Sequence, residues 1–157
     1  MKALVIYGTR YGNTQKIAEA IGDGLKPAFA VEVLPIDGVS PAQVTAADLL
    51  VIGGPTEAHG ITPALKAFVD GMSFALDGKP VAAFDTRVGI ARIFSGSAAA
   101  GIEAHMRRAG ARVIAGEGSF IVKGKQPELE PGELDRAQAW GRDLAARIRS
   151  LATVPAR

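Results

Sequence analysis

The chain has 157 residues, of which 48% are hydrophobic and 22% are charged, and its formal net charge is +2. This composition is typical of a soluble globular protein, and the length predicts a single domain over residues 1–157 with one substantial core. The absence of cysteine excludes disulfides and thiolate metal sites. The only histidines, His59 and His105, are far apart in the sequence, which argues against a histidine metal site.

No segment of the sequence is typical of a membrane span or of a secretory signal. None of its apolar runs reaches the length that a bilayer requires. The N-terminus leads directly into a strand-like segment, without the charged region, apolar stretch and cleavage site of a signal peptide. We therefore expect a cytoplasmic protein that does not associate with membranes.

The first fourteen residues predict a buried strand, a polar turn and the start of a helix. Residues 3–7 form an apolar run without alternation, which is typical of a strand buried on both faces of a parallel sheet. The run stops at Gly8, and a helical pattern then begins that places Ile17, Ile21 and Leu25 on one stripe. The first N–H groups of a helix have no intrahelical partner, and the helix dipole is positive there. The junction therefore predicts an anion site.

The rest of the chain alternates strand-like and helix-like segments. Apolar patterning predicts strands at residues 30–36, 49–52, 80–84 and 112–115, the last of which resumes at 119–122 after a Gly-Glu-Gly interruption. Helical periodicity predicts helices at residues 63–69, 97–109 and 134–151. Pro63 is at a favoured first helical position, and Ser97 is expected to cap its helix. The residues after Leu151 are expected to fray.

Five strands alternating with helices predict an α/β fold with a single doubly wound, five-stranded parallel sheet. Right-handed crossovers with a reversal after the first strand give the order 2-1-3-4-5. Ligands of such sheets bind beyond the carboxyl ends of the strands, where the strand order reverses. The segments after the first, third and fourth strands are therefore expected to form the site.

The polar turn after the first strand narrows the class of ligand. It lacks the lysine of the nucleotide-triphosphate loop G-x-x-x-x-G-K-[ST], and Gly8 and Gly12 do not make the dinucleotide fingerprint G-x-G-x-x-G. A terminal monophosphate held by neutral donors remains. The turn resembles the phosphate loop of the flavodoxin family, T/S-x-[TYF]-G-N-T, in which the matching residues here are Thr9, Arg10, Tyr11, Gly12, Asn13 and Thr14. The resemblance implies that they bind the phosphate of FMN, and the alternative is an ordinary helix with an Asn-Thr cap.

The segment after the third strand, residues 53–60, is similar to the family's first ring-binding loop. That loop often begins G-x-P-T and carries an aromatic side chain that stacks on the isoalloxazine ring. The resemblance implies ring contacts from Pro55, Thr56, His59 and Gly60. His59 is the only flat side chain in the segment, and its alternative is a solvated loop position.

The segment after the fourth strand departs from the family pattern. Family members usually place a second aromatic there with acidic neighbours, whereas residues 86–112 hold five arginines, one acid and no tyrosine. Asp85, Thr86 and Arg87 are the best candidates for contact with the pyrimidine edge of the ring. Arg87 is expected to favour the anionic reduced flavin, with a solvated surface position as its alternative.

Two aromatic side chains outside these motifs are expected to pack in the core. Trp140 lies beside the apolar stripe of the last helix, and Phe94 follows the fourth strand. For Phe94 the alternative is a cover over the flavin ring.

The resemblance implies an FMN-binding redox protein, either an electron carrier or a small NAD(P)H-dependent flavin reductase. No constellation of acid, base or nucleophile is evident, which fits a protein whose cofactor carries the chemistry. The alternative is a flavodoxin-like interaction module that has lost FMN and redox activity. A phosphorylated signalling receiver is disfavoured, because the strand ends hold Tyr7, Gly8, Ile52 and Gly53 rather than acidic residues.

The net charge of the chain indicates which kind of partner it would attract. Electron-carrying flavodoxins are typically strongly acidic, whereas this chain has a net charge of +2 and an isoelectric point of about 9.1. A basic rim would attract an acidic redox partner protein, either a reductase or an acceptor, or an anionic small molecule such as NAD(P)H or a quinone-like acid. No basic stripe interleaved with aromatics is evident, so nucleic acid is not expected as a partner.

Overall fold

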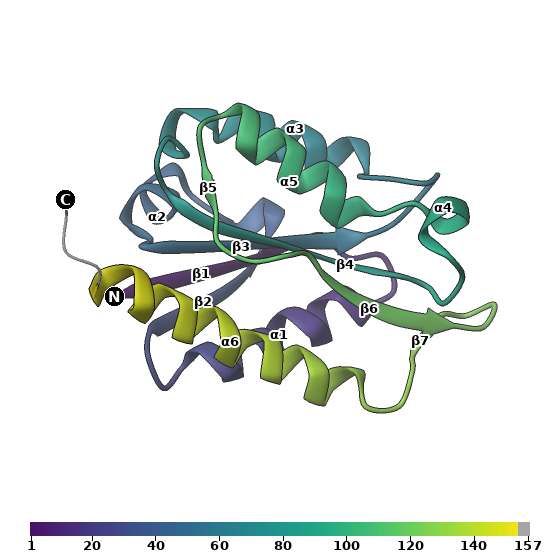
Figure 1. Ribbon diagram of the computed structural model, residues 1–157. Coiled ribbons are helices and arrows are strands. Elements are labelled where there is room, and N and C mark those ends of the chain that lie inside the picture. Colours follow the sequence, from purple (N-terminus) through teal and green to yellow (C-terminus); the bar gives the residue numbers. More distant parts are fainter. Residues whose placement is uncertain (154–157) are drawn as a thin grey trace.

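The computed structural model describes residues 1–153 and has a twisted sheet at its centre (Figure 1). The strand order is β2-β1-β3-β4-β6-β7, with β5 also paired with β4. The strands are β1 (Lys2–Tyr7), β2 (Ala30–Pro35), β3 (Leu49–Pro55), β4 (Pro80–Val88), β5 (Arg112–Val113), β6 (Gly118–Lys123) and β7 (Glu128–Leu129).

The predicted doubly wound order is confirmed, and the strand count differs at one edge. The fifth position of the sheet is shared by β5 and β6, which both pair with β4 in parallel. β5 ends before the Gly-Glu-Gly interruption, and β6 begins at the last glycine of that interruption, Gly118. A short antiparallel strand, β7, then extends β6 outward. The sequence indicated the interruption, but β7 pairs through only two residues and is too short to leave a periodic pattern.

Helices cover both faces of the sheet, with α1 and α6 on one side and α3 and α5 on the other (Figure 1). The helices are α1 (Asn13–Leu25), α2 (Pro41–Ala46), α3 (Pro63–Gly71), α4 (Arg92–Ser95), α5 (Ala98–Arg108) and α6 (Glu133–Thr153). The 3-10 turns are η1 (Ile36–Gly38) and η2 (Ser73–Ala75). The short α2 and α4 were not predicted, because helices of six and four residues show little periodicity. Fraying was expected after Leu151, but Ala152 and Thr153 still belong to α6, and the residues beyond Thr153 lie outside the described residues.

The core consists of two layers, one on each side of the sheet. Along β1, Ala3 and Val5 face the layer under α1 and α6, while Leu4 and Ile6 face the layer under α3 and α5. Both faces of the strand are buried, which explains why its sequence is apolar without alternation. Of the described helices, none combines the length and the apolar composition that a bilayer crossing requires.

The two aromatic side chains that were expected in the core have different positions. Trp140 packs edge-on against Phe84 and Phe120, with ring centroids 6.5 and 6.3 Å apart, so this prediction is confirmed. Phe94 is 65% exposed, so the expected core position is wrong. It lies on α4, a single short turn beyond the end of β4, where no sheet face is available to cover it.

The fourth strand is longer than predicted and changes the setting of the next residues. β4 continues to Val88, so Asp85, Thr86 and Arg87 belong to the strand rather than to a loop. All three pair with β6, and Asp85 and Thr86 also pair with β3 on the other side. Polar residues can extend a central strand here because they lie at its carboxyl end, where the candidate site begins.

Candidate functional site

The turn between β1 and α1 leaves the start of the helix without a side-chain cap. Gly12 is the N-cap residue, with a left-handed backbone at φ +87° that glycine adopts at little cost. Its N–H donates to Thr9 Oγ1 at 3.0 Å, and no side chain caps α1. The alternative of an Asn-Thr cap is therefore wrong, and the first amides of α1 are available to an external anion.

Two side chains at the start of α1 link it to distant strands. Asn13 Nδ2 donates to the carbonyl of Pro127 at 2.7 Å, which ties the turn to the segment between β6 and β7. The hydroxyls of Thr14 and Thr86 are hydrogen-bonded at 2.9 Å, which ties α1 to β4. The polar turn is thus held in place from two sides.

The phenol of Tyr7 lies directly before this turn and carries no charge at neutral pH. Burial raises the pKa of Tyr7 above its ordinary value of about 10, and the carboxylates of Glu19 and Asp37 raise it further. A protonated phenol adds no negative charge that would repel an anion. Within residues 1–153, no group of three or more His, Asp or Glu side chains is arranged to hold a metal ion.

A second helix begins at the same edge of the sheet, and an internal anion occupies its N-terminus. Asp85 is fully buried, and its Oδ2 accepts hydrogen bonds from Ser97 Oγ at 2.8 Å, Ala99 N at 3.1 Å and Thr56 Oγ1 at 3.2 Å. Its Oδ1 accepts from Ser119 Oγ at 2.7 Å. Asp85 therefore underlies the site and holds it together, rather than lying in the position expected for a ring contact.

The hydroxyls around Asp85 complete the capping of α5. Ser97 Oγ accepts from the N–H of Ala100, which confirms Ser97 as the cap, and Thr56 Oγ1 accepts from the N–H of Ala98. The first amides of α5 are therefore satisfied within the protein. Of these two helix starts, α1 is the one whose amides no side chain caps.

Asp85→Asn is expected to lower the free energy of unfolding by about 2 kcal/mol. The asparagine side chain keeps one acceptor oxygen, but its N–H₂ group would face donors that need an acceptor. Hydrogen bonds to charged groups contribute about 1.5–3 kcal/mol each. Chemical denaturation of the ligand-free protein measures the change. A variant as stable as the parent would show that the four hydrogen bonds contribute no net stability.

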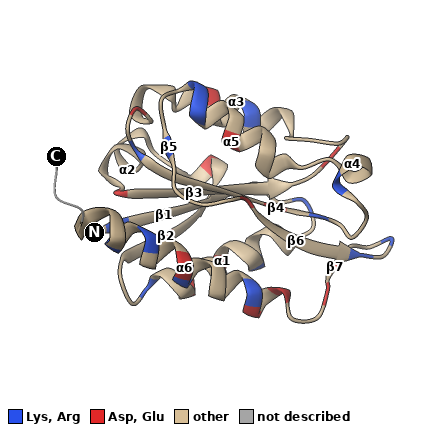
Figure 2. Cartoon of the chain, viewed as in Figure 1, with Lys and Arg blue, Asp and Glu red and all other residues tan. Residues whose placement is uncertain are grey.

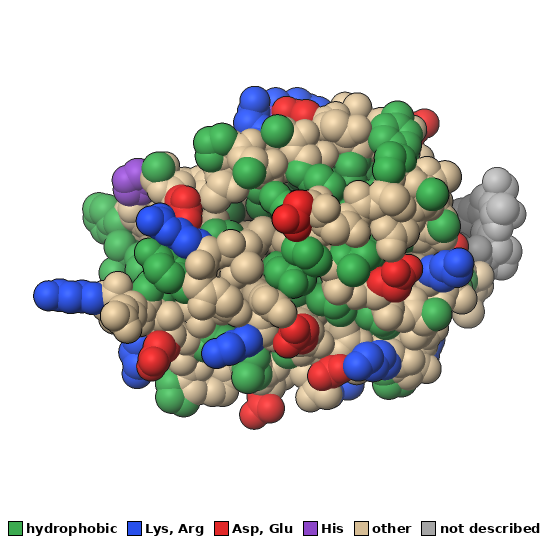
Figure 3. All heavy atoms as spheres, turned by 180° about the vertical axis from the view of Figure 1, so that it is seen from behind, with side chains coloured by type: hydrophobic (Ala, Val, Ile, Leu, Met, Phe, Trp, Pro, Cys, Tyr) green, Lys and Arg blue, Asp and Glu red, His purple; other side chains and the backbone are tan. Residues whose placement is uncertain are grey.

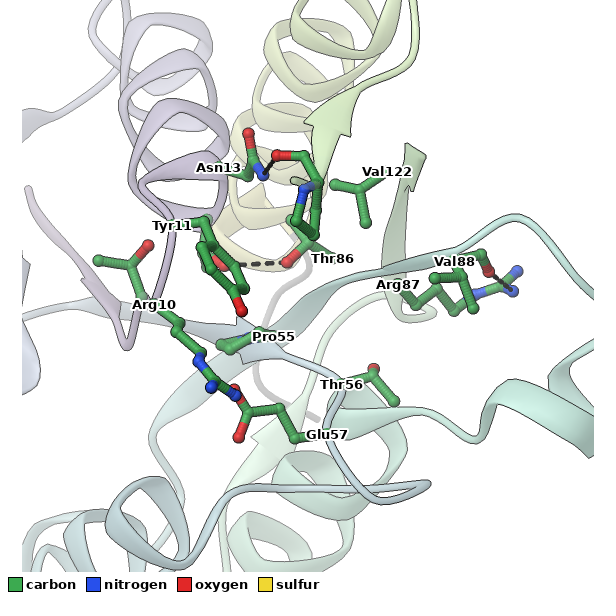
Figure 4. Close-up of a pocket in the computed structure, with 13 residues that line it drawn as sticks. Arg10, Tyr11, Asn13, Pro55, Thr56, Glu57, Thr86, Arg87, Val88 and Val122 are labelled. Atoms are coloured by element: carbon green, nitrogen blue, oxygen red, sulfur yellow. Dashed lines mark hydrogen bonds and ion pairs between the residues drawn. The ribbon is translucent and has the colours of Figure 1, made fainter. Parts of the chain in front are cut away.

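An open hollow of about 550 Å³ lies over this edge of the sheet (Figure 4). Most of the residues predicted from the sequence line it: Thr9, Arg10, Tyr11, Asn13, Thr14, Pro55, Thr56, Thr86 and Arg87. Those predicted from the sequence that do not line it are Gly12, His59, Gly60 and Asp85. Three separate segments of the sequence therefore meet at one cavity.

His59 does not line this cavity and lies in a tight turn. Glu57 and Gly60 exchange two backbone hydrogen bonds, at 3.1 and 2.9 Å, which leaves Ala58 and His59 as a two-residue turn with positive φ angles. The side chain of His59 is exposed, which matches its alternative as a loop histidine.

Tyr11 is the aromatic side chain of the cavity wall. The guanidinium carbon of Arg10 lies 5.3 Å from the centroid of the Tyr11 ring, and Arg10 pairs with Glu57 at 3.6 Å. Figure 4 shows this group of side chains bridging the turn before α1 and the loop after β3. The phosphate-loop motif identified Tyr11, but nothing in the sequence predicted that it lies close to the loop after β3.

The guanidinium of Arg87 is directed toward the segment after β4 and away from Tyr11 (Figure 4). Its Nε donates to Ser119 Oγ at 2.7 Å. Its Nη1 donates to the carbonyls of Val88 at 3.3 Å and Ile90 at 2.8 Å, and to Ser95 Oγ at 3.3 Å. Arg87 lines the cavity, but its guanidinium is hydrogen-bonded to neighbouring protein groups and does not face the centre of the cavity.

Two of the five arginines at residues 86–112 are paired with acidic side chains. Arg92 forms an ion pair with Glu117, and Arg107 pairs with Glu103 at 2.8 Å. Positive and negative side chains are interspersed along the chain and over the face opposite to the view of Figure 1 (Figures 2 and 3). Glu117 lies outside residues 86–112, so counting charges within that segment alone overestimates the local positive charge.

The comparison with known families matches the part of the chain that carries most of this geometry. A family model described as a flavodoxin domain matches residues 4–93, which include the turn before α1, the loop after β3 and the end of β4. The chain belongs to the flavodoxin family.

Individual flavodoxins support this membership over the whole chain. A flavodoxin of Clostridium saccharobutylicum is 28% identical over 163 residues, which cover 96% of this chain and 99% of that protein. A flavodoxin of Aquifex aeolicus is 36% identical over 94 residues, which cover 56% of this chain and 51% of that protein. The structure of a flavodoxin from the domain Archaea has a TM-score of 0.77 and 25% identity, and it covers 95% of this chain and 99% of that one.

Some residues of the cavity were missed by sequence reasoning. Glu57 and Val88 lie beside predicted positions but carried no motif of their own. Val122 and Pro127 come from β6 and the segment before β7, far from the motifs in sequence. No local signal identifies them, because only the parallel pairing of β4 with β6 brings this segment to the site.

Proposed function

We propose that this member of the flavodoxin family binds FMN and carries electrons between redox proteins. The observation that carries the proposal is the uncapped N-terminus of α1, with the Thr9 hydroxyl and the Asn13 side chain beside it. Free amides at the positive end of a helix suit a phosphate group. The membership of the flavodoxin family supports the same ligand.

The residues of the cavity fit the two chemical parts of FMN. Thr9, Thr14 and the amides of α1 are neutral donors, which suits one terminal phosphate without a metal ion. Tyr11, Pro55, Val88 and Val122 supply apolar wall, and Thr86 supplies a hydroxyl beside it, which suits a flat ring with polar edges. When bound, FMN would supply the electron-transfer chemistry. The protein would hold the phosphate, orient the ring and exclude water from the ring's buried face.

A carrier is favoured over an NAD(P)H-dependent reductase and over a module without FMN. The relatives found over most or half of the chain are named flavodoxins, which favours the carrier. The intact phosphate turn argues against loss of the cofactor. The proposed donor and acceptor are therefore redox proteins rather than NAD(P)H or a quinone-like small molecule.

Titration of the purified protein with FMN and with FAD, followed by anaerobic addition of NADPH, tests the proposal. We expect tight binding of one FMN per chain and much weaker binding of FAD. We expect no reduction by NADPH until a flavoprotein reductase is added in catalytic amount. Rapid reduction by NADPH alone would favour the reductase. Failure to bind FMN would favour the interaction module.

A further inference from the structure

We propose that Ser119 is a positioning residue of the site, which links the buried charge of Asp85 to Arg87 and thereby fixes the segment at residues 88–95. Ser119 lies on β6 directly opposite Asp85 on β4, in the register of two neighbouring parallel strands. It does not line the cavity. The consequence for FMN rests on the proposed function, whereas the consequence for residues 88–95 concerns the protein without a ligand.

The chemistry of the groups determines the direction of each hydrogen bond. A carboxylate only accepts, so the single hydroxyl proton of Ser119 is donated to Asp85 Oδ1, at 2.7 Å. Ser119 Oγ in turn accepts the Nε–H of Arg87, also at 2.7 Å. A cation and a buried anion are thus connected through one hydroxyl.

The other end of the guanidinium holds residues 88–95. Arg87 Nη1 donates to two backbone carbonyls and to Ser95 Oγ within this segment. The large apolar side chains there contribute little packing, because Ile93 is 86% exposed and Ile90 and Phe94 are also exposed. A segment with few buried contacts depends on its hydrogen bonds for order. The link through Ser119 therefore contributes to the order of this segment, together with the ion pair between Arg92 and Glu117.

The segment borders one part of the cavity only. Val88 and Arg87 lie on one side of the cavity, while Arg10 and Tyr11 of the turn before α1 lie on the other side (Figure 4). Loss of the link should therefore weaken contacts with a ring and leave phosphate binding intact. This separation distinguishes positioning from a general loss of structure.

The test compares Ser119→Ala with Ser119→Thr, which keeps the hydroxyl, and with Ser150→Ala. Ser150 donates to the carbonyl of Ala146 on α6, far from the site, and serves as a matched control. For Ser119→Ala without ligand, we expect amide hydrogen exchange in residues 88–96 to become about tenfold faster, as for loss of one hydrogen bond to a charged group. The dissociation constant for FMN should rise about tenfold, and that for inorganic phosphate should stay within twofold. The other two variants should behave like the parent.

Several outcomes would overturn the proposal. Unchanged exchange in residues 88–96 would show that Ser119 does not hold the segment, even if FMN binds tightly. Equal weakening of phosphate and FMN binding, or no recovery in Ser119→Thr, would indicate general destabilisation. If Ser119→Ala does not fold, Ser119→Cys replaces the hydroxyl with a thiol, which is a weak donor and a weak acceptor, while all donors of Arg87 are kept, and faster exchange is again expected. If the parent binds no FMN while the exchange result holds, the proposed function fails and the positioning role stands.

Discussion

Replacing Thr9 and Thr14 together with alanine is expected to lower the affinity for FMN by two or more orders of magnitude. Each substitution removes a hydroxyl beside the uncapped start of α1, where the dianionic phosphate is proposed to bind. A hydrogen bond to a charged group contributes about 1.5–3 kcal/mol, and 1.4 kcal/mol corresponds to a factor of ten. Isothermal titration with FMN measures the change.

The control for this prediction is Thr45→Ala. Thr45 donates to the carbonyl of Pro41 on α2, at the opposite edge of the sheet from the cavity, and its loss should leave FMN affinity unchanged. Titration with riboflavin, which lacks the phosphate, should give similar affinities for the double variant and the parent. A double variant that binds FMN as tightly as the parent would contradict a phosphate site at this turn.

Gly141→Ala is expected to lower the free energy of unfolding by about 3 kcal/mol. In α6, Gly141 faces α1 so closely that a Cβ atom would lie 2.3 Å from the carbonyl oxygen of Ile21 and 3.2 Å from Gly24 Cα. Alanine stabilises a helix by about 1 kcal/mol relative to glycine, but here the contact is with backbone that cannot rotate away. Overpacking of this kind costs about 1–3 kcal/mol or more, so the steric effect outweighs helix propensity.

Gly71→Ala provides the matched control in another helix. Gly71 ends α3, and a Cβ atom there would meet no other atom within 4 Å. Its substitution should leave stability unchanged or raise it by up to about 1 kcal/mol. Urea denaturation of both variants measures the difference. If Gly141→Ala is as stable as the parent, α1 and α6 do not pack through this glycine.

The sequence by itself determined the order of the sheet through β4 and the turn before α1. These features depend on neighbouring residues, namely the apolar run of residues 3–7, the stripe of Ile17, Ile21 and Leu25, and a motif of six consecutive residues. Each of these patterns lies within one strand, one helix or one short motif, so it can be recognised without knowing the tertiary contacts. They also identified most of the cavity wall, because loops that follow parallel strands meet at one edge.

Only the tertiary structure decided the positions and contacts of Asp85, Arg87, His59 and Phe94. Asp85 and Ser119 are 34 residues apart and Asn13 and Pro127 are 114 apart, so no local pattern predicts that they meet. A polar residue at a strand end has the same sequence signature whether it faces a ligand or accepts hydrogen bonds from a neighbouring strand. Which of the two occurs depends on residues that are distant in sequence. Here the pairing of β4 with β6 places Ser119 beside Asp85, so that Asp85 accepts its hydrogen bond.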